Sequence, residues 1–221
     1  MTRPRAVLWD LDGTLTDSVR FVVDTANTVI ARHGGAALEF DRVGRMTGLP
    51  LEAIFRLAWP DLSDADAITY RDEYRRIYDE VAIPATKLFR GARATLHAFR
   101  RADILQATVT GKRAADCERI LRGLGIKKEV DAYLGGDSVR HAKPAPDLAL
   151  AAAERLGTRP ADCVVIGDSR VDMAMGRAAG MRTLQVLWGY EKERVGEADD
   201  AVRTWPALRA RILGGDGPVR P

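Results

Sequence analysis

Two carboxylates, Asp10 and Asp12, directly follow the short apolar run at residues 6–9. Gly13 and Thr14 come next, so the stretch reads DLDGT. An ionised carboxylate is costly at the end of a buried strand unless a positive charge lies beside it. Because residues 6–9 have the composition of such a strand, the sequence predicts a cationic partner for these carboxylates and a site where they do chemistry.

Other polar groups occupy equivalent places along the chain, after an apolar run or ahead of a helix. They are Thr110-Gly111-Lys112 after residues 104–109, Lys143 ahead of a helix expected from Pro146, and Gly167-Asp168 after residues 163–166. In a parallel sheet, ligands bind at the carboxyl ends of the strands. We therefore expect these groups to meet Asp10 and Asp12 at one edge of a sheet.

The carboxylates of Asp10, Asp12 and Asp168 would repel one another strongly in a dry site, and Asp172 lies one helical turn beyond Asp168. A hard divalent cation relieves such repulsion, and oxygen ligands with retained waters suit Mg²⁺. A carboxylate can also act as a nucleophile toward phosphorus and form an aspartyl-phosphate. The set therefore indicates Mg²⁺-dependent phosphoryl transfer.

Phosphoryl transfer needs positive charge and N–H donors around the phosphoryl oxygens. We expect the Lys143 ammonium and the Thr110 hydroxyl to contact these oxygens. Backbone amides of Leu11, Gly13 and Gly111 are expected to supply further donors. Gly13 also allows a tight turn beside the phosphate, because glycine adopts dihedral angles that other residues avoid.

Apolar runs alternate with helical patterns through most of the chain. The runs predicted as strands are residues 6–9, 104–109, 133–134, 163–166 and 183–187. The predicted helices cover residues 19–30, 114–124, 146–156, a stretch that ends near residue 180, and 205–213. This alternation predicts an α/β fold, with a Rossmann-like parallel sheet and helices on both faces.

Residues 16–88 depart from the alternation, because the pattern there is helical throughout and contains no strand signal. We therefore predict a core domain of residues 1–15 and 89–221, and an all-helical cap domain of residues 16–88 inserted after the first strand. The insertion has a capping-box-like helix start and a row of tyrosines expected to pack in a core: Ser63 with Asp66, and Tyr70, Tyr74 and Tyr78.

Four motifs resemble, in order, those of the haloacid dehalogenase superfamily: DLDGT at residues 10–14, TGK at 110–112, KP at 143–144 and GDSRVD at 167–172. The helical insertion after the first motif looks like the mobile cap of the phosphoglycolate phosphatase-like branch. The first and fourth motifs are specific in combination, whereas TGK and KP carry little weight alone. The resemblance extends over nearly the whole chain.

The resemblance implies a role for each acidic residue. Asp10 matches the nucleophile that takes the phosphoryl group, and Asp12 matches the acid/base that protonates the leaving oxygen and then activates water. Mg²⁺ would be held by the Asp10 carboxylate, the Asp12 backbone carbonyl and the Asp168 carboxylate, with Asp172 nearby in a supporting role. The implied reaction is hydrolysis of a small, phosphoglycolate-like phosphate monoester.

The resemblance also implies which residues bind the phosphoryl oxygens, because Thr110 and Lys143 match them. Gly111 departs from the family pattern, since relatives often carry Asn at this position. Its amide remains, but a side-chain contact is lost. The departure bears on the substrate and leaves the reaction class unchanged.

Other activities share parts of this pattern. Dehalogenase members lack the second aspartate of the first motif, so Asp12 favours phosphate chemistry. Phosphonate-cleaving relatives use a cap lysine as a Schiff base, and residues 15–86 contain no lysine. A nucleotide or pyrophosphate phosphatase stays open. A non-catalytic binding protein on this fold is disfavoured, because Asp10, Lys143 and Asp168 are present as well.

Sugar-phosphate mutases are the main alternative, because they share all four motifs. They also grip a second phosphate, typically with a cap arginine beside the glycine of the cap loop. Here that place reads Gly48-Leu49-Pro50-Leu51, an apolar loop that favours a phosphatase. Arg42, Arg45 and Arg56 lie close enough in sequence to keep the mutase open. Arg45, Gly48 and Arg56 are thus the candidate substrate contacts of the cap.

The 221-residue chain has a formal net charge of +3 and 46% hydrophobic residues, as in an ordinary globular enzyme. No basic block with interleaved aromatics occurs, so we expect no nucleic-acid partner and a small anionic phosphorylated metabolite as ligand. No apolar stretch suits a signal peptide or a membrane span, which predicts a cytoplasmic protein without a membrane partner. We expect a monomer or a homodimer. Cys117 and Cys163 are expected to be reduced core thiols, and His141 a surface loop residue.

Overall fold

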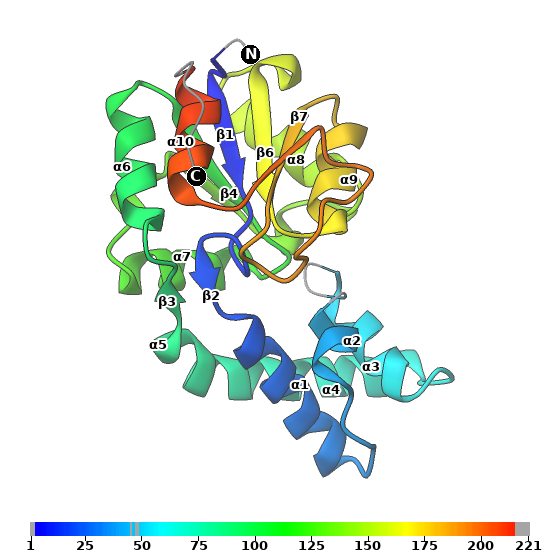
Figure 1. The fold of residues 1–221 in the computed structure, drawn as a ribbon. Helices are drawn as coiled ribbons and strands as arrows, with labels where there is room; N and C mark the ends of the chain where they lie inside the picture. The colour runs from blue at the N-terminus through cyan, green and yellow to red at the C-terminus, as the bar shows by residue number, and fades with distance from the viewer. Residues whose placement is uncertain (1–2, 45, 47–48, 215–221) are drawn as a thin grey trace.

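A computed structural model describes residues 3–44, 46 and 49–214 of the chain. At its centre lies a six-stranded sheet in which all neighbouring strands run parallel (Figure 1). The strand order is β5-β4-β1-β6-β7-β8, which confirms the predicted fold class. The strands are β1 (Ala6–Trp9), β4 (Leu105–Val109), β5 (Ala132–Leu134), β6 (Cys163–Gly167), β7 (Arg182–Val186) and β8 (Asp200–Val202).

Helices cover both faces of this sheet. Successive side chains of β1 point to opposite faces, so Val7 and Trp9 pack in one apolar cluster, whereas Ala6 and Leu8 pack in another. The first cluster is completed by α6 (Ala92–Arg101), α7 (Ala114–Gly123) and α10 (Trp205–Leu213), and the second by α8 (Asp147–Arg155) and α9 (Arg170–Ala178). Strand β1 is therefore buried on both faces.

Strand β8 was not predicted. It has three residues, begins at Asp200 and pairs with β7 at the edge of the sheet. So short an edge strand has neither an apolar run nor a clear alternation, and tertiary pairing rather than local pattern makes it a strand.

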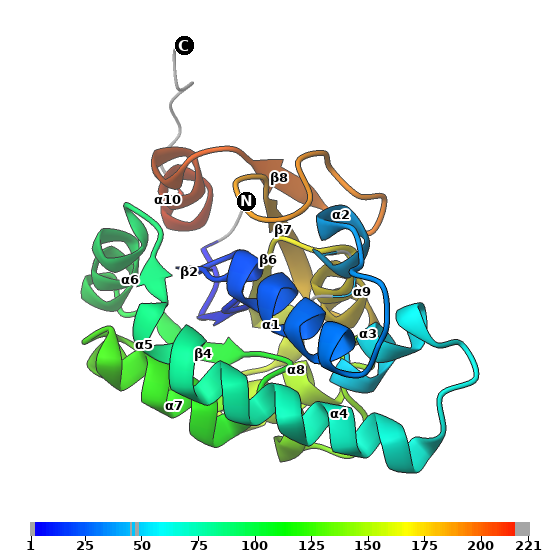
Figure 2. The same ribbon diagram turned by 90° about the horizontal axis from the view of Figure 1, so that it is seen from below.

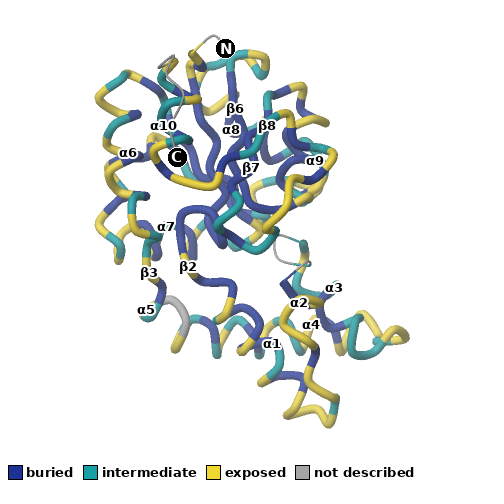
Figure 3. Tube along the Cα trace, in the orientation of Figure 1, coloured by how far each residue is buried: buried dark blue, intermediate teal, exposed yellow. Residues whose placement is uncertain are grey.

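The segment between the first strand and α6 folds into helices that lie beyond the carboxyl ends of the strands (Figures 1 and 2). They are α1 (Val19–Arg32), α2 (Phe40–Gly44), α3 (Leu51–Ala58), α4 (Asp64–Ile77), a π-helical turn (Tyr78–Ala82) and the short α5 (Ile83–Ala85). The helices enclose an apolar cluster of their own, in which Val22, Phe55 and Tyr74 are buried. Their outer faces are exposed, whereas the strands of the sheet are mostly buried (Figure 3).

The prediction that residues 16–88 are helical throughout is wrong at the two ends of this segment. Thr16–Asp17 (β2) and Lys87–Leu88 (β3) form a two-stranded antiparallel ribbon. Strands of two residues are too short to produce a periodic signal. The ribbon places the chain's entry into the helical segment beside its exit from it.

The two cysteines, Cys117 and Cys163, are buried and free, as expected of core thiols. Within the described residues, no helix combines the length and the apolar composition needed to cross a membrane.

Candidate active site

The carboxyl ends of β1 and β6 bring two carboxylates together. Asp10 directly follows β1, Asp168 directly follows β6, and the two strands are hydrogen-bonded neighbours. The Asp10 N–H donates to the carbonyl oxygen of Ile166 at 2.8 Å, which extends the strand pairing by one residue. Asp10 and Asp168 are 5% and 3% exposed. The parallel register of the sheet therefore produces a buried acidic pair.

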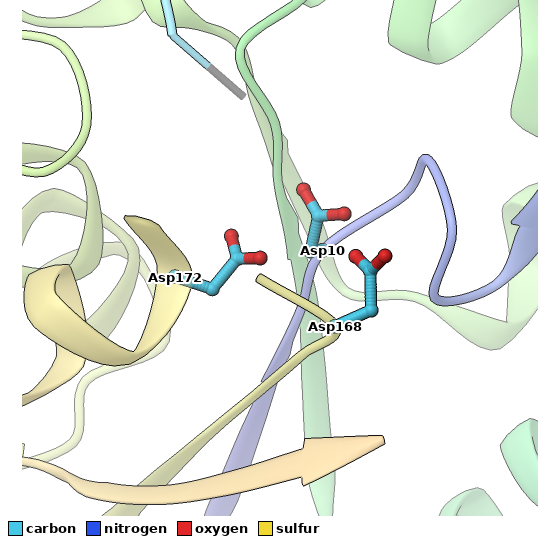
Figure 4. Close-up of side chains that lie close together, drawn as sticks. All are labelled: Asp10, Asp168 and Asp172. Atoms are coloured by element: carbon cyan, nitrogen blue, oxygen red, sulfur yellow. The ribbon is translucent and has the colours of Figure 1, made fainter. Parts of the chain in front are cut away.

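A third carboxylate joins this pair from the start of α9. Ser169 is the N-cap residue of this helix, and Asp172 completes a capping box with it. Oδ2 of Asp172 accepts a hydrogen bond from the Ser169 hydroxyl at 2.6 Å. One carboxylate oxygen from each of Asp10, Asp168 and Asp172 lies within 4.8 Å of the other two, and Figure 4 shows the three side chains around a common space.

Lys143 supplies the cationic partner that the sequence predicts. Its Nζ donates to Oδ1 of Asp10 at 2.7 Å and to Oδ1 of Asp172 at 2.6 Å, and its side chain is completely buried. Burial alone would lower the pKa of Lys143, but the neighbouring Asp10 and Asp172 carboxylates raise it well above the usual range. Lys143 therefore carries its positive charge inside the protein.

One lysine does not balance three buried carboxylates. Burial, and then repulsion from Asp172, raise the pKa of Asp10 to about 7, although Lys143 acts in the opposite direction. Burial and the charges of Asp10 and Asp172 also raise the pKa of Asp168 well above its usual value. Buried oxygen donors with excess negative charge fit a hard divalent cation, whose charge would favour the ionised carboxylates.

Asp12 lies beside this cluster in a different environment. Its Oδ1 accepts a hydrogen bond from the Ser18 hydroxyl, and its Oδ2 lies 2.9 Å from Nζ of Lys112. Ser18 is the N-cap residue of α1, the first helix of the insertion. The two aspartates of the first motif thus have separate partners: Asp10 contacts the sheet-edge lysine, and Asp12 contacts a residue at the start of the helical insertion.

The sequence placed Lys112 at this edge of the sheet but predicted no specific contact or role for it. Besides its ion pair with Asp12, its Nζ donates to the Tyr78 hydroxyl at 2.9 Å and lies 4.1 Å from the centroid of the Tyr78 ring. Burial acts against its charge, but Asp12 raises the pKa of Lys112 well above its usual value. The sequence did contain a signal for Lys112, because this residue follows the same predicted strand as Thr110.

Tyr78 and Tyr74 combine two functions. They pack in the apolar cluster of the insertion, as the tyrosine row predicted, and they also line the cavity described below.

Among the described residues, a backbone N–H and a hydroxyl hold the carboxylate of Asp168. Its Oδ2 accepts a hydrogen bond from the Tyr190 N–H at 2.5 Å, and its Oδ1 accepts one from the Thr14 hydroxyl at 3.3 Å. A Cβ atom on Gly13, whose φ is +80°, would lie 2.3 Å from Oδ2 of Asp168, so glycine is required there. The Gly13 N–H, expected to contact phosphate, instead donates to the carbonyl oxygen of Thr16 at 2.8 Å.

A cavity of about 290 Å³ lies between the sheet edge and the insertion. Asp10, Asp12, Thr110 and Gly111 line it from the sheet edge, as the sequence predicts. The Thr110 hydroxyl is buried and accepts a hydrogen bond from the backbone N–H of Lys112 at 3.3 Å. The volume suits a small metabolite, since pockets for drug-sized ligands start at about 300 Å³.

The structure does not bring every candidate residue to this cavity. Arg56 pairs with Asp64 at 2.5 Å and is not among the described residues that line the cavity, so its contact with substrate stays a prediction. Arg45 and Gly48 lie outside the described residues. Leu11 is completely buried, and its amide as a phosphate donor stays a prediction.

His141, expected in a surface loop, is exposed and lies 2.9 Å from Oδ1 of Asp147.

Comparison with known proteins agrees with this geometry. Residues 7–186 match the family model of haloacid dehalogenase-like hydrolases. A phosphoglycolate phosphatase of Xylella fastidiosa is 35% identical over 204 residues, which cover 92% of this chain and 87% of that protein. A phosphoglycolate phosphatase of Aquifex aeolicus is 30% identical over 188 residues, which cover 85% of this chain and 87% of that protein.

Solved structures share the fold over almost the whole chain. A structure from Bacteroides fragilis, described as a haloacid dehalogenase-like hydrolase, is 28% identical with a TM-score of 0.87 and covers 93% of this chain and 100% of its own. A hydrolase from Pseudomonas syringae is 23% identical with a TM-score of 0.83, and 96% of this chain matches 99% of that one. The chain therefore belongs to the haloacid dehalogenase-like hydrolases, in their phosphoglycolate phosphatase-like branch, and is a phosphoric monoester hydrolase.

Proposed function

We propose that the chain is a Mg²⁺-dependent phosphatase that hydrolyses a small phosphate monoester of the phosphoglycolate type through an aspartyl-phosphate on Asp10. The observation that carries this proposal is the placement of Asp10. It accepts a hydrogen bond from a buried lysine, lies within 4.8 Å of two further carboxylates and lines the same cavity as Asp12. The two relatives named phosphoglycolate phosphatase support the choice of substrate type.

In the first step, a carboxylate oxygen of Asp10 attacks phosphorus while the bond from phosphorus to the ester oxygen breaks. Asp12 gives its proton to that oxygen, so the alcohol leaves neutral. Lys143, fixed at 2.7 Å from Asp10, offsets negative charge as the phosphate approaches the carboxylate. The Thr110 hydroxyl and the Gly111 amide would orient the phosphoryl oxygens.

In the second step, Asp12, now ionised, takes a proton from water as the water oxygen attacks the phosphorus. The bond between phosphorus and Asp10 breaks, which releases inorganic phosphate and restores both carboxyl groups. Asp12 suits this proton transfer because its partners, Ser18 and Lys112, differ from those of Asp10. The two aspartates therefore have distinct roles although one residue separates them.

The acidic cluster fits the metal that this reaction needs. Mg²⁺ would be held by the carboxylates of Asp10 and Asp168 and the backbone carbonyl of Asp12, with Asp172 beside it, and would neutralise charge on the phosphate and its nucleophile. Asp172 suits a supporting position, because its two oxygens already bind Lys143 and Ser169.

We further propose that residues 16–88 form a cap domain that closes over the site. The antiparallel ribbon of β2 and β3 would act as its hinge, because both connections to the sheet pass through it. The separate apolar cluster of the insertion supports movement as a unit. Two buried free cysteines suit a reducing compartment, in line with a cytoplasmic enzyme.

The test is release of phosphate from 2-phosphoglycolate and from a generic aryl phosphate. Activity should require added Mg²⁺ and disappear with EDTA. Asp10→Asn should abolish turnover, because an amide is not a nucleophile toward phosphorus. An Asp10→Asn variant with wild-type turnover would refute the covalent mechanism. Isomerisation rather than hydrolysis of β-glucose 1-phosphate would instead identify a mutase.

A further inference from the structure

One side of α4 forms a wall of the active-site cavity. Tyr74, Arg75, Tyr78 and Asp79 share one side of this helix and its π-helical continuation, and all four line the cavity. The same cavity is lined by Asp10 at the sheet edge. A ligand whose phosphate is bound at Asp10 can therefore extend toward α4.

Three cationic side chains line this cavity among the described residues: Arg75, Lys112 and Arg113. Two of them have close anionic partners within the protein. Lys112 pairs with Asp12 at 2.9 Å, and Arg113 donates to the two carboxylate oxygens of Asp116 at 2.6 and 2.9 Å. Their charges are largely neutralised before any ligand binds.

Arg75 has no comparably close acidic partner among the described residues. Its ion pair with Asp72 is 3.5 Å long, and Asp72 already accepts a hydrogen bond from Nε of Arg71 at 2.9 Å. Burial, and then repulsion from Arg71 and Arg113, lower the pKa of Arg75. The guanidinium remains charged, because arginine does not lose its proton in proteins, so positive potential persists at this wall.

The acidic residues on the same wall do not cancel this potential, because other arginines bind them. Glu52 accepts a hydrogen bond from Arg71 at 3.0 Å. Asp79 lies 3.2 Å from Arg113. Arg75 is thus the cation of the described cavity lining that is most open to an external anion.

We infer that Arg75 binds a second anionic group of the substrate, a carboxylate, at the α4 wall of the cavity. This inference rests on the proposed phosphatase function and narrows the substrate to small phosphate monoesters that carry a carboxylate. A guanidinium can form two parallel hydrogen bonds with a carboxylate, which gives both affinity and orientation. Val22, Leu51 and Ile54 line the cavity with apolar surface for the carbon atoms between the two anionic groups.

A purely structural role for Arg75 would rest on its pair with Asp72. That pair joins residues three apart on one helix, and the Asp72 side chain is 57% exposed. Ion pairs of this kind contribute about 0–1 kcal/mol to folding. Removal of the Arg75 charge should therefore leave the fold intact, and effects on substrates can be measured directly.

The experiment compares Arg75→Met with the wild type on two substrates, 2-phosphoglycolate and ethyl phosphate, which differ in the carboxylate. We expect kcat/KM for 2-phosphoglycolate to fall about 10- to 100-fold, the range expected for hydrogen bonds to a charged group. The value for ethyl phosphate should change less than about threefold, because that ester makes no contact with Arg75. Equal losses on both esters, or no loss on either, would overturn the inference.

Arg76→Met is the matched control. Arg76 is the next residue of α4, is exposed, and is not among the described residues that line the cavity, so the same loss of charge should alter neither substrate. Arg75→Lys should recover part of the activity on 2-phosphoglycolate, since it restores the charge without the planar fork. If Arg76→Met matched Arg75→Met, long-range charge rather than a contact would explain the effect.

Binding measurements distinguish a failure of this inference from a failure of the proposed function. Phosphonoacetate carries a carboxylate and a non-hydrolysable P–C bond, whereas methylphosphonate lacks the carboxylate. Calorimetry with Mg²⁺ should show that Arg75→Met weakens binding of phosphonoacetate alone. An enzyme that hydrolyses neither ester but binds phosphonoacetate through Arg75 would refute the phosphatase and keep the carboxylate site. An active enzyme whose affinity for phosphonoacetate is unchanged by Arg75→Met would keep the phosphatase and refute the carboxylate site.

Discussion

The sheet edge and helix α4 line opposite parts of one cavity and carry their charges in different ways. At the sheet edge, Lys143 is completely buried and joined to Asp10 and Asp172 at 2.7 and 2.6 Å. On α4, Arg75 and Asp72 are 33% and 57% exposed and lie 3.5 Å apart. Buried charges need fixed partners, whereas exposed charges interact weakly through water. Substitutions at the sheet edge should therefore abolish the reaction, whereas substitutions on α4 should alter which substrate is bound.

The largest expected effect on stability follows from removal of the buried cation. Lys143→Met leaves Asp10 and Asp172 buried together without a counter-charge. We expect the free energy of unfolding of the metal-free protein to fall by about 3–5 kcal/mol, because breaking a buried pair leaves an uncompensated charge. Urea denaturation in EDTA measures this loss, and phosphatase activity should disappear with it.

The matched variant on α4 is Arg71→Met. Arg71 also bridges two carboxylates, Glu52 and Asp72, at 3.0 and 2.9 Å, but its side chain is 24% exposed. Its removal should cost less than about 1 kcal/mol. Equal costs for Lys143→Met and Arg71→Met would show that burial does not distinguish the two regions.

The sequence predicted the sheet edge well because simple rules determine it. A buried parallel strand places whatever follows it at the carboxyl edge, so Asp10, Thr110 and Asp168 could be located from apolar runs alone. The one-turn spacing from Asp168 likewise placed Asp172 beside this edge, where it lies at the start of α9.

The wall of α4 could not be predicted in this way. The helical pattern placed Tyr74 and Tyr78 on one side of a helix, but the rotation of that helix toward the sheet depends on tertiary packing. The end of a strand placed Lys112 at the sheet edge near Asp12. No local pattern reports its contact with Tyr78, which lies in the helical insertion and is distant in sequence. Arg75 is one of several arginines on α4, and only the cavity distinguishes it from its neighbours.

A smaller effect is expected from pH. Burial and Asp172 raise the pKa of Asp10 to about 7 in the folded protein, above its value in the unfolded chain. Such a carboxyl stabilises the fold at low pH, and this contribution is lost as the pH rises through about 7. Between about pH 5 and about pH 7, stability of the metal-free protein should fall by up to about 1.4 kcal/mol per pH unit for this proton.

Mg²⁺ should reverse this trend, because the metal takes the place of the proton on the cluster. Thermal unfolding with EDTA and with Mg²⁺ should therefore show a larger metal-induced stabilisation at about pH 8 than at about pH 5. Asp10→Asn removes the titrating group and should flatten the difference. A metal effect that is independent of pH would contradict the buried, protonated state of the cluster.

The smallest effect tests whether the two regions respond separately to the same change. Ser63 caps α4 and accepts a hydrogen bond from the Asp66 N–H at 3.1 Å, while Thr204 caps α10 of the core and accepts one from the Ala207 N–H at 3.3 Å. Ser63→Ala and Thr204→Ala should each cost about 1 kcal/mol. If the insertion opens as a unit of its own, Ser63→Ala should increase hydrogen exchange in α1 and α4. Thr204→Ala should instead increase hydrogen exchange in the core, beside the sheet. Faster exchange of β1 and β6 in Ser63→Ala would instead show that the insertion and the sheet unfold together, and that α4 cannot change independently of the site it faces.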